Sequence, residues 1–212
     1  MPMWVGDKAP AERTPPKPLA PSQLGRDTVV APPPSPAQRG AVRRGTLMHA
    51  LFEKLPGLAP GLRAERAAQW LLAQAPDLEP AVRAEMVAQV LALMDKPDFA
   101  PLFAPEALRE APLTAVVGGQ VIAGTVDCLA VGATEIWVAD FKTGQVIPSV
   151  LAEIPQTYVL QMAAYKAALA RIFPDKAVRA SLIYTAGPRC WDLPDEMLAA
   201  ALDAIEAEAK TA

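Results

Sequence analysis

The fold is decided by the stretch Ile136-Trp137-Val138-Ala139-Asp140-Phe141-Lys142-Thr143-Gly144. Its first four residues are apolar on both faces, which is typical of a strand covered by helices on each side. Asp140 and Lys142 follow two residues apart, and this spacing puts both side chains on one face of a strand. Two charges at the end of a buried strand are costly unless they have partners or a chemical task. The stretch therefore predicts either a structural ion pair at a turn or a functional site.

A second strand-like run, residues 121–131, precedes this stretch and contains one charge, Asp127. Gly132-Ala133 between the runs suits a two-residue hairpin loop, and that register makes Asp127 and Asp140 diagonal neighbours, roughly 7–8 Å apart at the backbone. A symmetric four-residue loop instead sets the two aspartates directly opposite each other. Either register brings two carboxylates to one face, where they repel unless one is protonated or a cation lies between them. Oxygen ligands favour Mg²⁺ or Mn²⁺, and Lys142 can stabilise negative charge or orient a water there.

The composition fits one domain with a substantial core, because 52% of the 212 residues are hydrophobic. The net charge of −3 provides no bulk basicity of the kind that marks a nucleic-acid binder. We expect no transmembrane helix and no membrane partner, since no run of 18 apolar residues occurs, and the N-terminus lacks the apolar core of a secretory signal. Cys128 and Cys190 lack zinc spacing, so we expect free thiols and a cytoplasmic location.

Residues 1–40 hold ten of the 23 prolines and show no apolar periodicity, which predicts an extended arm or linker. Residues 1–44 carry seven Lys or Arg against three Asp or Glu, a net +4 that leaves −7 for the remainder. Arg43 and Arg44 lead into the first predicted helix and are candidate contacts for phosphate. The competing interpretation, more common for such segments, is a solvated linker whose basic residues serve solubility.

Apolar periodicity divides the rest of the chain into a helical part, residues 41–105, and an α/β core, residues 106–212. We expect helices over 41–55, 63–75, 79–95, 155–173 and 195–208, and strands over 110–117, 121–131, 136–142 and 178–185. Gly118-Gly119 is a strong hairpin signal between the first two strands. A helix between the third and fourth strands suggests a right-handed crossover. The predicted fold class is α/β, a mixed central sheet flanked by helices.

Four further residues are candidates for the site around Asp140. His49, the only histidine, lies on the first predicted helix, where a lone histidine is more often a packed side chain than a ligand. Glu110 begins the first predicted strand and either joins the site or is an exposed charge. Gln161 and Tyr165 are four residues apart and so share one face of a helix. That face either binds phosphate or a base or is a partly exposed helix surface.

Taken in order, these residues resemble the RecB-type subgroup of the PD-(D/E)XK nuclease superfamily. The matching motifs are Gly45-x-x-x-His49, Gly124-Thr-Val-Asp127, Asp140-Phe-Lys142-Thr-Gly144 and Gln161-x-x-x-Tyr165. One short motif would be weak, but four in sequence across residues 40–190 make a specific likeness. The proline-rich arm leading into Arg-Arg-Gly-Thr-Leu-Met-His looks most like the C-terminal nuclease domain of AddA-type helicase–nucleases.

The resemblance implies a restriction-endonuclease-like core within a nuclease domain that spans residues 41–212. It implies that His49, Asp127, Asp140 and the carbonyl of Phe141 ligate the metal. The implied reaction is hydrolysis of DNA phosphodiester bonds by an exonuclease, with Mg²⁺ as the cofactor and Mn²⁺ as the alternative.

The same resemblance implies roles for the polar residues around the metal. Lys142 would act at the nucleophilic water or the phosphate. Gln161 and Tyr165 would organise the site and contact the DNA strand. Glu110 matches, more loosely, the acidic position ahead of the Gly-x-x-Asp strand, and is a possible additional site residue.

Partners outside this sequence are implied as well: DNA, an AddB-like subunit and the helicase part of the same polypeptide, acting in double-strand break repair and recombination. The four cysteines of iron–sulphur relatives and a GxxxxGK[ST] phosphate loop are absent from the sequence, so we expect neither a cluster nor an ATPase in this chain. The main alternative is an inactive nuclease-fold module that guides DNA or scaffolds a subunit. Degenerate relatives lose the carboxylates or the lysine, whereas this chain keeps them. A metallohydrolase acting on another substrate ranks third.

Overall fold

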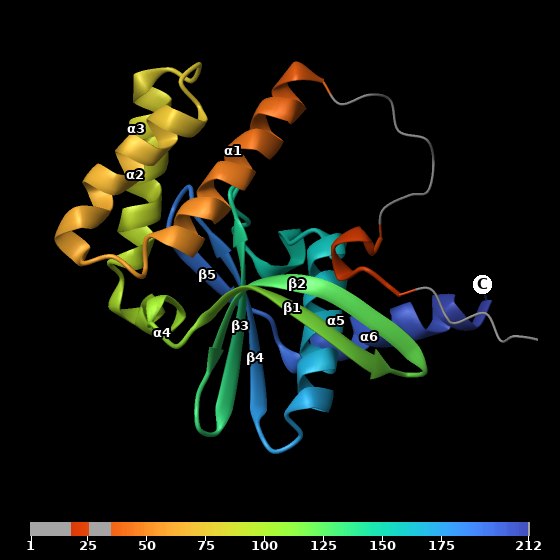
Figure 1. Cartoon of the computed structure of the whole chain (residues 1–212). Coiled ribbons are helices and arrows are strands. Elements are labelled where there is room, and N and C mark those ends of the chain that lie inside the picture. Colours follow the sequence, from red (N-terminus) through yellow and green to blue (C-terminus); the bar gives the residue numbers. More distant parts are fainter. Residues whose placement is uncertain (1–17, 26–34, 212) are drawn as a thin grey trace, which may run out of the picture.

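The computed structural model describes residues 18–25 and 35–211 and shows a five-stranded sheet between two layers of helices (Figure 1). This architecture confirms the predicted α/β fold with a mixed central sheet. No helix in the described ranges combines the length and apolar content needed to cross a bilayer. The elements in chain order are η2 (Pro21–Gln23), α1 (Pro36–Lys54), α2 (Pro60–Gln74), α3 (Pro80–Met94), η3 (Pro97–Phe99), α4 (Ala100–Phe103), β1 (Leu108–Val117), β2 (Gln120–Val131), β3 (Glu135–Lys142), η4 (Leu151–Glu153), α5 (Gln156–Ile172), β4 (Ala177–Tyr184), β5 (Arg189–Asp192) and α6 (Asp195–Thr211).

The strands follow one another across the sheet in the order β1-β2-β3-β4-β5. β3 and β4 pair in parallel with α5 as the crossover, and the other neighbours pair antiparallel. Gly118 and Gly119 make the first hairpin turn with φ values of +55° and +82°, which glycine adopts without steric cost. Strand β5 was not predicted from the sequence, because its four residues, Arg-Cys-Trp-Asp, are too short for an alternating pattern.

The side chains of β3 alternate between two apolar layers. Ile136 and Val138 lie in the layer formed with α5 and α6. Trp137, Ala139 and Phe141 lie in the layer formed with α1 to α4. All five are buried, as expected for a strand that is apolar on both faces. The end of β3 is therefore enclosed between the helix layers, and this is where the two charged residues of the strand lie.

Helix α1 begins at Pro36, five residues before the start predicted from apolar periodicity. The helix begins with a capping box. The backbone N–H of Gln38 donates to Ser35 Oγ at 3.2 Å, and the backbone N–H of Ser35 donates to Gln38 Oε1 at 2.7 Å. The proline-rich composition concealed this start, because proline is favourable in the first turn of a helix.

Part of the predicted arm, residues 18–25, lies against β2 and α5 (Figure 1). The Leu19 N–H donates to the Val121 carbonyl at 2.7 Å, and the Ala123 N–H donates to the Leu19 carbonyl at 3.0 Å. Gly124 permits this approach, because a Cβ at that position would lie 3.0 Å from Pro21 Cδ. Residues 1–17 and 26–34 of the predicted arm lie outside the described residues, so a linker there stays a prediction.

Leu51→Ala should lower the free energy of unfolding by about 3 kcal/mol, because truncating a fully buried leucine loses its transfer energy and leaves a cavity. Leu51 is 0% exposed in the layer beneath α1, whereas Leu72 on α2 is 54% exposed. Leu72→Ala is the matched control and should change stability by less than about 0.5 kcal/mol. Urea unfolding followed by circular dichroism measures both, and equal effects would contradict the burial assigned to α1.

Candidate active site

Two aspartates come opposite each other where the β2–β3 ladder ends. Val131 pairs with Ile136, so the connecting loop has four residues and the register is the symmetric one of the two considered. The two-residue loop does not occur. Continuing the register past the last pair sets Asp127 opposite Asp140. Asp127 Oδ2 also accepts a hydrogen bond of 2.7 Å from the backbone N–H of Phe141, which fixes the carboxylate against β3.

Glu110 adds a third carboxylate on the other side of Asp127. It lies between Arg109 and Ala111, whose pairing with β2 places Glu110 opposite Asp127. Its φ is +47°, and no other non-glycine residue in the described ranges has a positive φ. A left-handed conformation costs an L-residue roughly 1–2 kcal/mol, and such strain is concentrated at functional sites. The strained backbone thus belongs to a residue of the acidic cluster.

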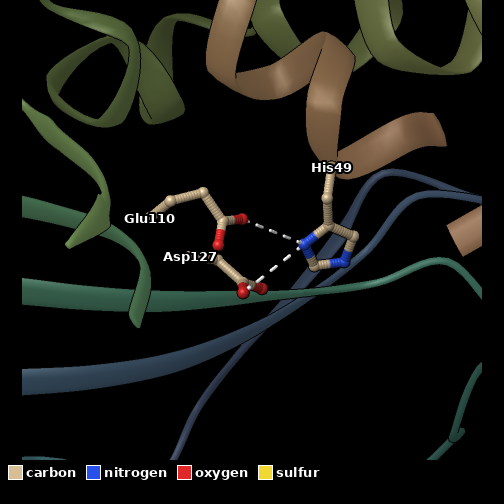
Figure 2. Close-up of side chains that lie close together, drawn as sticks. All are labelled: His49, Glu110 and Asp127. Carbon is tan, nitrogen blue, oxygen red and sulfur yellow. Dashed lines mark ion pairs between the residues drawn. The ribbon is translucent and has the colours of Figure 1, made fainter. Parts of the chain in front are cut away.

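His49 of α1 faces two of these carboxylates, as Figure 2 shows. Its Nδ1 lies 3.4 Å from Asp127 Oδ1 and 3.8 Å from Glu110 Oε1. Its Nε2 donates to the Phe141 carbonyl at 3.0 Å. One ligand atom each from His49, Glu110 and Asp127 lies within 4.8 Å of the other two. A nitrogen donor with convergent carboxylates is a donor set that divalent metals accept.

The electrostatics of the cluster favour the binding of a cation. Burial opposes the charged form of His49, but the hydrogen bond and charge of Asp127, with the charges of Asp140 and Glu110, raise its pKa to about 9. Burial and the charge of Asp127 raise the pKa of Glu110. Burial and Asp127 also raise the pKa of Asp140, although Lys142 opposes this. The carboxylates thus bind protons more readily than isolated carboxylates do and stabilise the proton on His49, and a divalent cation would stabilise their charged forms instead.

Metal binding should therefore release a proton from His49 at neutral pH. Its pKa is raised from 6.5 to about 9 in the metal-free protein, so below about pH 9 the imidazole must lose a proton before it can bind metal. The apparent Mn²⁺ affinity should rise by up to about tenfold per pH unit between pH 6.5 and 8.5. Calorimetric titration at several pH values measures it. The His49→Gln control should have a shallower pH dependence, and a flat profile in the unchanged protein would contradict this role of His49.

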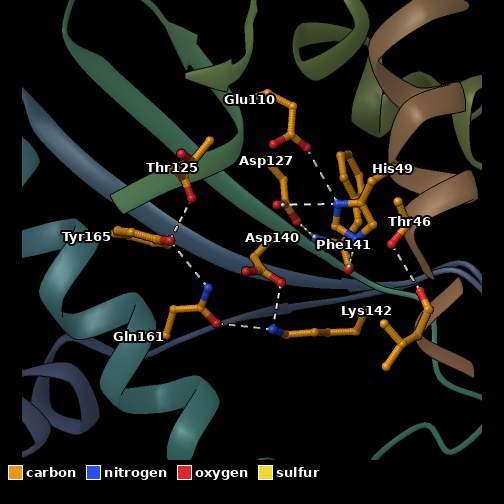
Figure 3. Close-up of polar contacts among 11 residues, drawn as sticks. Thr46, His49, Glu110, Thr125, Asp127, Asp140, Phe141, Lys142, Gln161 and Tyr165 are labelled. Carbon is orange, nitrogen blue, oxygen red and sulfur yellow. Dashed lines mark hydrogen bonds and ion pairs between the residues drawn. The ribbon is translucent and has the colours of Figure 1, made fainter. Parts of the chain in front are cut away.

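Asp140 and Lys142 form the second half of the site (Figure 3). Lys142 Nζ lies 2.7 Å from Asp140 Oδ2 and donates to Gln161 Oε1 at 3.2 Å. The Gln161 amide donates to Tyr165 Oη at 3.4 Å, and Tyr165 donates to the Thr125 carbonyl at 2.6 Å. This chain of contacts connects β3, α5 and β2. It holds the ammonium of Lys142 against the one buried carboxylate of the site, since Asp140 is only 5% exposed.

Helix α1 closely approaches the turn after β3. Gly45, one turn before His49, makes this possible, because a Cβ there would lie 3.0 Å from Thr143 Oγ1. Arg44 donates to the Thr143 carbonyl at 2.8 Å and to Gln89 Oε1 at 2.7 Å. These contacts fix α1 on β3, so that His49 reaches the carboxylates.

Two cavities give access to the cluster from different sides. One of about 240 Å³ lies between α5 and the sheet and is lined by residues of both halves of the site, namely His49, Asp127, Asp140, Phe141, Lys142, Gln161, Ser22, Thr157 and Tyr158. The other, about 580 Å³, lies on the α1 side and includes His49, Glu110 and Asp127 in its wall. His49 and Asp127 line both cavities, so a ligand can approach the cluster from either side.

The structure brings the residues predicted for catalysis and metal binding together, with three differences in arrangement. Asp140 lies outside the compact ligand group, and its carboxylate is paired with Lys142. Glu110, predicted only as a possible addition, lies inside that group. The carbonyl of Phe141, a predicted ligand, is hydrogen-bonded to His49.

The predicted DNA contacts mostly have internal partners. Arg43 forms two hydrogen bonds with Asp77, at 2.5 and 2.7 Å, and Arg44 is the residue that binds the turn after β3. Tyr165 is 2% exposed, so a direct contact with a DNA strand does not fit its position, whereas an organising role does. Gln161 lines the cavity between α5 and the sheet, so its side chain is accessible to a ligand there.

Sequence reasoning missed Ser22 and Thr157 in the cavity wall. Ser22 gave no signal, because it lies in the proline-rich segment. Tyr158, which also lines this cavity, was not among the predicted site residues. Its ring lies under the Lys142 ammonium, with Nζ 3.7 Å from the ring centroid.

Comparisons with known proteins agree with this geometry. The family model described as the PD-(D/E)XK nuclease superfamily matches residues 23–209. A crystal structure of a candidate exonuclease from Eubacterium rectale aligns with a TM-score of 0.57 and 14% identity, over 85% of this chain and 67% of that chain. At this identity the likeness concerns the fold alone. A structure of the protein SSO0001 aligns with a TM-score of only 0.30 and 13% identity, over 75% of this chain and 82% of that chain.

No curated protein matches the sequence. The family match, however, spans nearly the whole chain, including β1 to β3, which carry the acidic cluster and Lys142. The chain therefore belongs to the PD-(D/E)XK nuclease superfamily.

Proposed function

We propose that this chain is a metal-dependent DNA nuclease domain that hydrolyses phosphodiester bonds as an exonuclease. The observation that carries the proposal is the convergence of Asp127, Asp140 and Lys142 at one end of the sheet, with His49 and Glu110 beside them. A buried carboxylate paired with a lysine, in one cluster with a strained acidic residue, is an arrangement suited to chemistry rather than to stability.

Mg²⁺ is the proposed cofactor, with Mn²⁺ as the alternative. His49, Glu110, Asp127 and Asp140 would hold the ion, and the carbonyl of Phe141 would contribute once its hydrogen bond with His49 is released. When bound, the metal lowers the pKa of a water and offsets the charge of the phosphate. The acidic donor set and the raised pKa values of Glu110 and Asp140 support this assignment.

Lys142 provides the positive charge that the protein itself supplies to the reaction. An ammonium has three donors, and within the described chain Asp140 and Gln161 occupy two of them. The third is proposed to bind a phosphate oxygen or the attacking water, where it stabilises negative charge in the transition state. Gln161 and Tyr165 position this lysine by holding it from the side of α5.

In its larger setting, we propose that the domain belongs to an AddA-type helicase–nuclease of the cytoplasm that acts in double-strand break repair and recombination. The motif order given above supports this assignment. The acidic net charge of −3 supports it as well, because strong non-specific DNA binding requires many phosphate contacts by Lys and Arg. The helicase part of the polypeptide and an AddB-like subunit would then supply most of the grip on DNA.

Degradation of end-labelled single- and double-stranded DNA tests the proposed activity. We expect Mg²⁺-dependent shortening of linear DNA that stops on chelation, while covalently closed circular DNA stays intact. Cleavage of the circles would contradict exonuclease action. Intact linear DNA in both Mg²⁺ and Mn²⁺, with metal binding retained by calorimetry, would favour the inactive DNA-guiding or scaffold module.

A further inference from the structure

A third cavity adjoins the catalytic cavity, which is the one between α5 and the sheet, and the proposed reaction does not use it. These two cavities share Phe141, Lys142 and Tyr158 in their walls. The third cavity has a volume of about 370 Å³, which falls in the range of ligand-binding pockets. A strand whose phosphate lies beside Lys142 would therefore have this space next to it.

The wall of this cavity is largely aromatic and apolar, with one carboxylate, that of Glu153. Tyr158, Tyr184, Pro148 and Pro155 contribute to it, and Val146, which is 85% exposed, contributes from the loop after β3. Lys142, on the wall shared with the catalytic cavity, is the only cation among the described lining residues. The cavity therefore suits a flat heteroaromatic group better than a phosphate.

Tyr184 is a further aromatic residue in this wall. The residue is 3% exposed, and its hydroxyl is shielded from solvent and has no hydrogen-bond partner within the described chain. Burial raises its pKa to about 12, so the phenol stays neutral. Tyr184 therefore adds no charge to the wall, and a ligand in the cavity does not reach its hydroxyl.

Tyr158 supplies an aromatic ring to the wall that the two cavities share. The Lys142 ammonium lies 3.7 Å from its ring centroid, a cation–π contact that ties the ring to the catalytic lysine. Tyr158 thus lies between the proposed phosphate position and the third cavity.

We propose that this cavity is a nucleobase subsite, which takes the base of a nucleotide next to the scissile phosphate. The base would stack on the Tyr158 ring. The inference rests on the proposed nuclease function and deepens it. Aromatic stacking accepts every base, because each has a π-face, so the subsite confers little sequence preference. A base in this cavity is unpaired, so the strand is single at the point of cleavage.

Position-resolved cleavage of single-stranded DNA that carries one abasic nucleotide tests the subsite. Cleavage at the one phosphodiester next to the abasic position should be about tenfold slower than at the same bond of intact DNA, because one stacking interaction is lost. Bonds farther away should be cut at the rate found for intact DNA. The cleavage products are resolved by length on a sequencing gel.

Three variants test whether the cavity causes this local slowing, or pause. Tyr158→Leu should abolish the pause, since it removes the stacking ring. Tyr184→Phe and Thr185→Val are the controls, because each deletes a buried hydroxyl that is shielded from solvent. Both controls should keep the pause. A general slowing in Tyr158→Leu would reflect a shift of Lys142, so only the loss of the pause reports the base contact.

The outcomes separate the subsite from the nuclease. Uniform cleavage of abasic DNA by the unchanged protein, or a pause that persists in Tyr158→Leu, would overturn the subsite but not the proposed nuclease activity. If the protein cuts no DNA, fluorescence anisotropy with the same intact single strands decides. A drop in affinity of about tenfold in Tyr158→Leu alone would then support the subsite without the nuclease, and unchanged affinity would overturn it.

Discussion

Asp140→Asn should slow Mg²⁺-dependent DNA cleavage by about 10³-fold, because it removes one proposed metal ligand and the partner of Lys142 in one step. Asparagine has nearly the same shape as aspartate, so the fold of a site that is only 5% exposed should be kept. Single-turnover cleavage of labelled single-stranded DNA measures the rate. Calorimetric titration with Mn²⁺ should show weaker binding in the same variant.

Asp192→Asn is the matched control for this variant. Asp192 is an aspartate of the same sheet, on β5, and binds Arg179 by two hydrogen bonds of 2.9 Å. It does not line the catalytic cavity. Its loss should leave both cleavage and metal affinity unchanged. An Asp140→Asn protein that cuts DNA as fast as this control would contradict the assignment of Asp140 to the site.

Lys142→Met should lower the cleavage rate by about 10²- to 10³-fold without weakening metal binding. Methionine keeps much of the length of the side chain but removes the ammonium that is held 2.7 Å from Asp140. Metal affinity should not fall, since a positive charge leaves the neighbourhood of the cation site. Rate and Mn²⁺ affinity, measured together, distinguish this variant from Asp140→Asn, which should lose both.

Lys166→Met is the control for removal of a lysine. Lys166 is a half-buried residue of α5 that pairs with the exposed Asp195, 2.5 Å away. This variant should cut DNA at the normal rate. If Lys142→Met lost metal binding along with activity, the lysine would be holding the acidic cluster together rather than acting on the phosphate, and the proposed division of roles would fail.

The site was predictable where short-range patterns carry it. The spacing of Asp140 and Lys142 on a strand, and of Gln161 and Tyr165 on a helix, places each pair on one face whatever the rest of the chain does. The structure connects both pairs in one network. The position of Glu110 was not predictable in this way, because its approach to His49 depends on a φ of +47° that no sequence pattern signalled.

The same limit applies to the residues expected to bind DNA. Arg44 has a guanidinium group suited to binding phosphate, yet this group donates to the carbonyl of Thr143, 99 positions away. Tyr165 has a hydroxyl suited to a ligand, yet that hydroxyl donates to the carbonyl of Thr125, 40 positions away. A side chain's partner depends on which distant backbone group comes within hydrogen-bond reach, and that is set by the packing of helices on the sheet.

By itself, the sequence determined the fold class, the first hairpin, the crossover helix and the order of the motif residues, because these follow from local periodicity and turn chemistry. Only the tertiary structure decided the register that sets Asp127 opposite Asp140, the strained approach of Glu110, and the docking of residues 18–25 on β2. The reason is physical: periodicity says which face a residue occupies, whereas register and contact depend on distances between segments far apart in the chain.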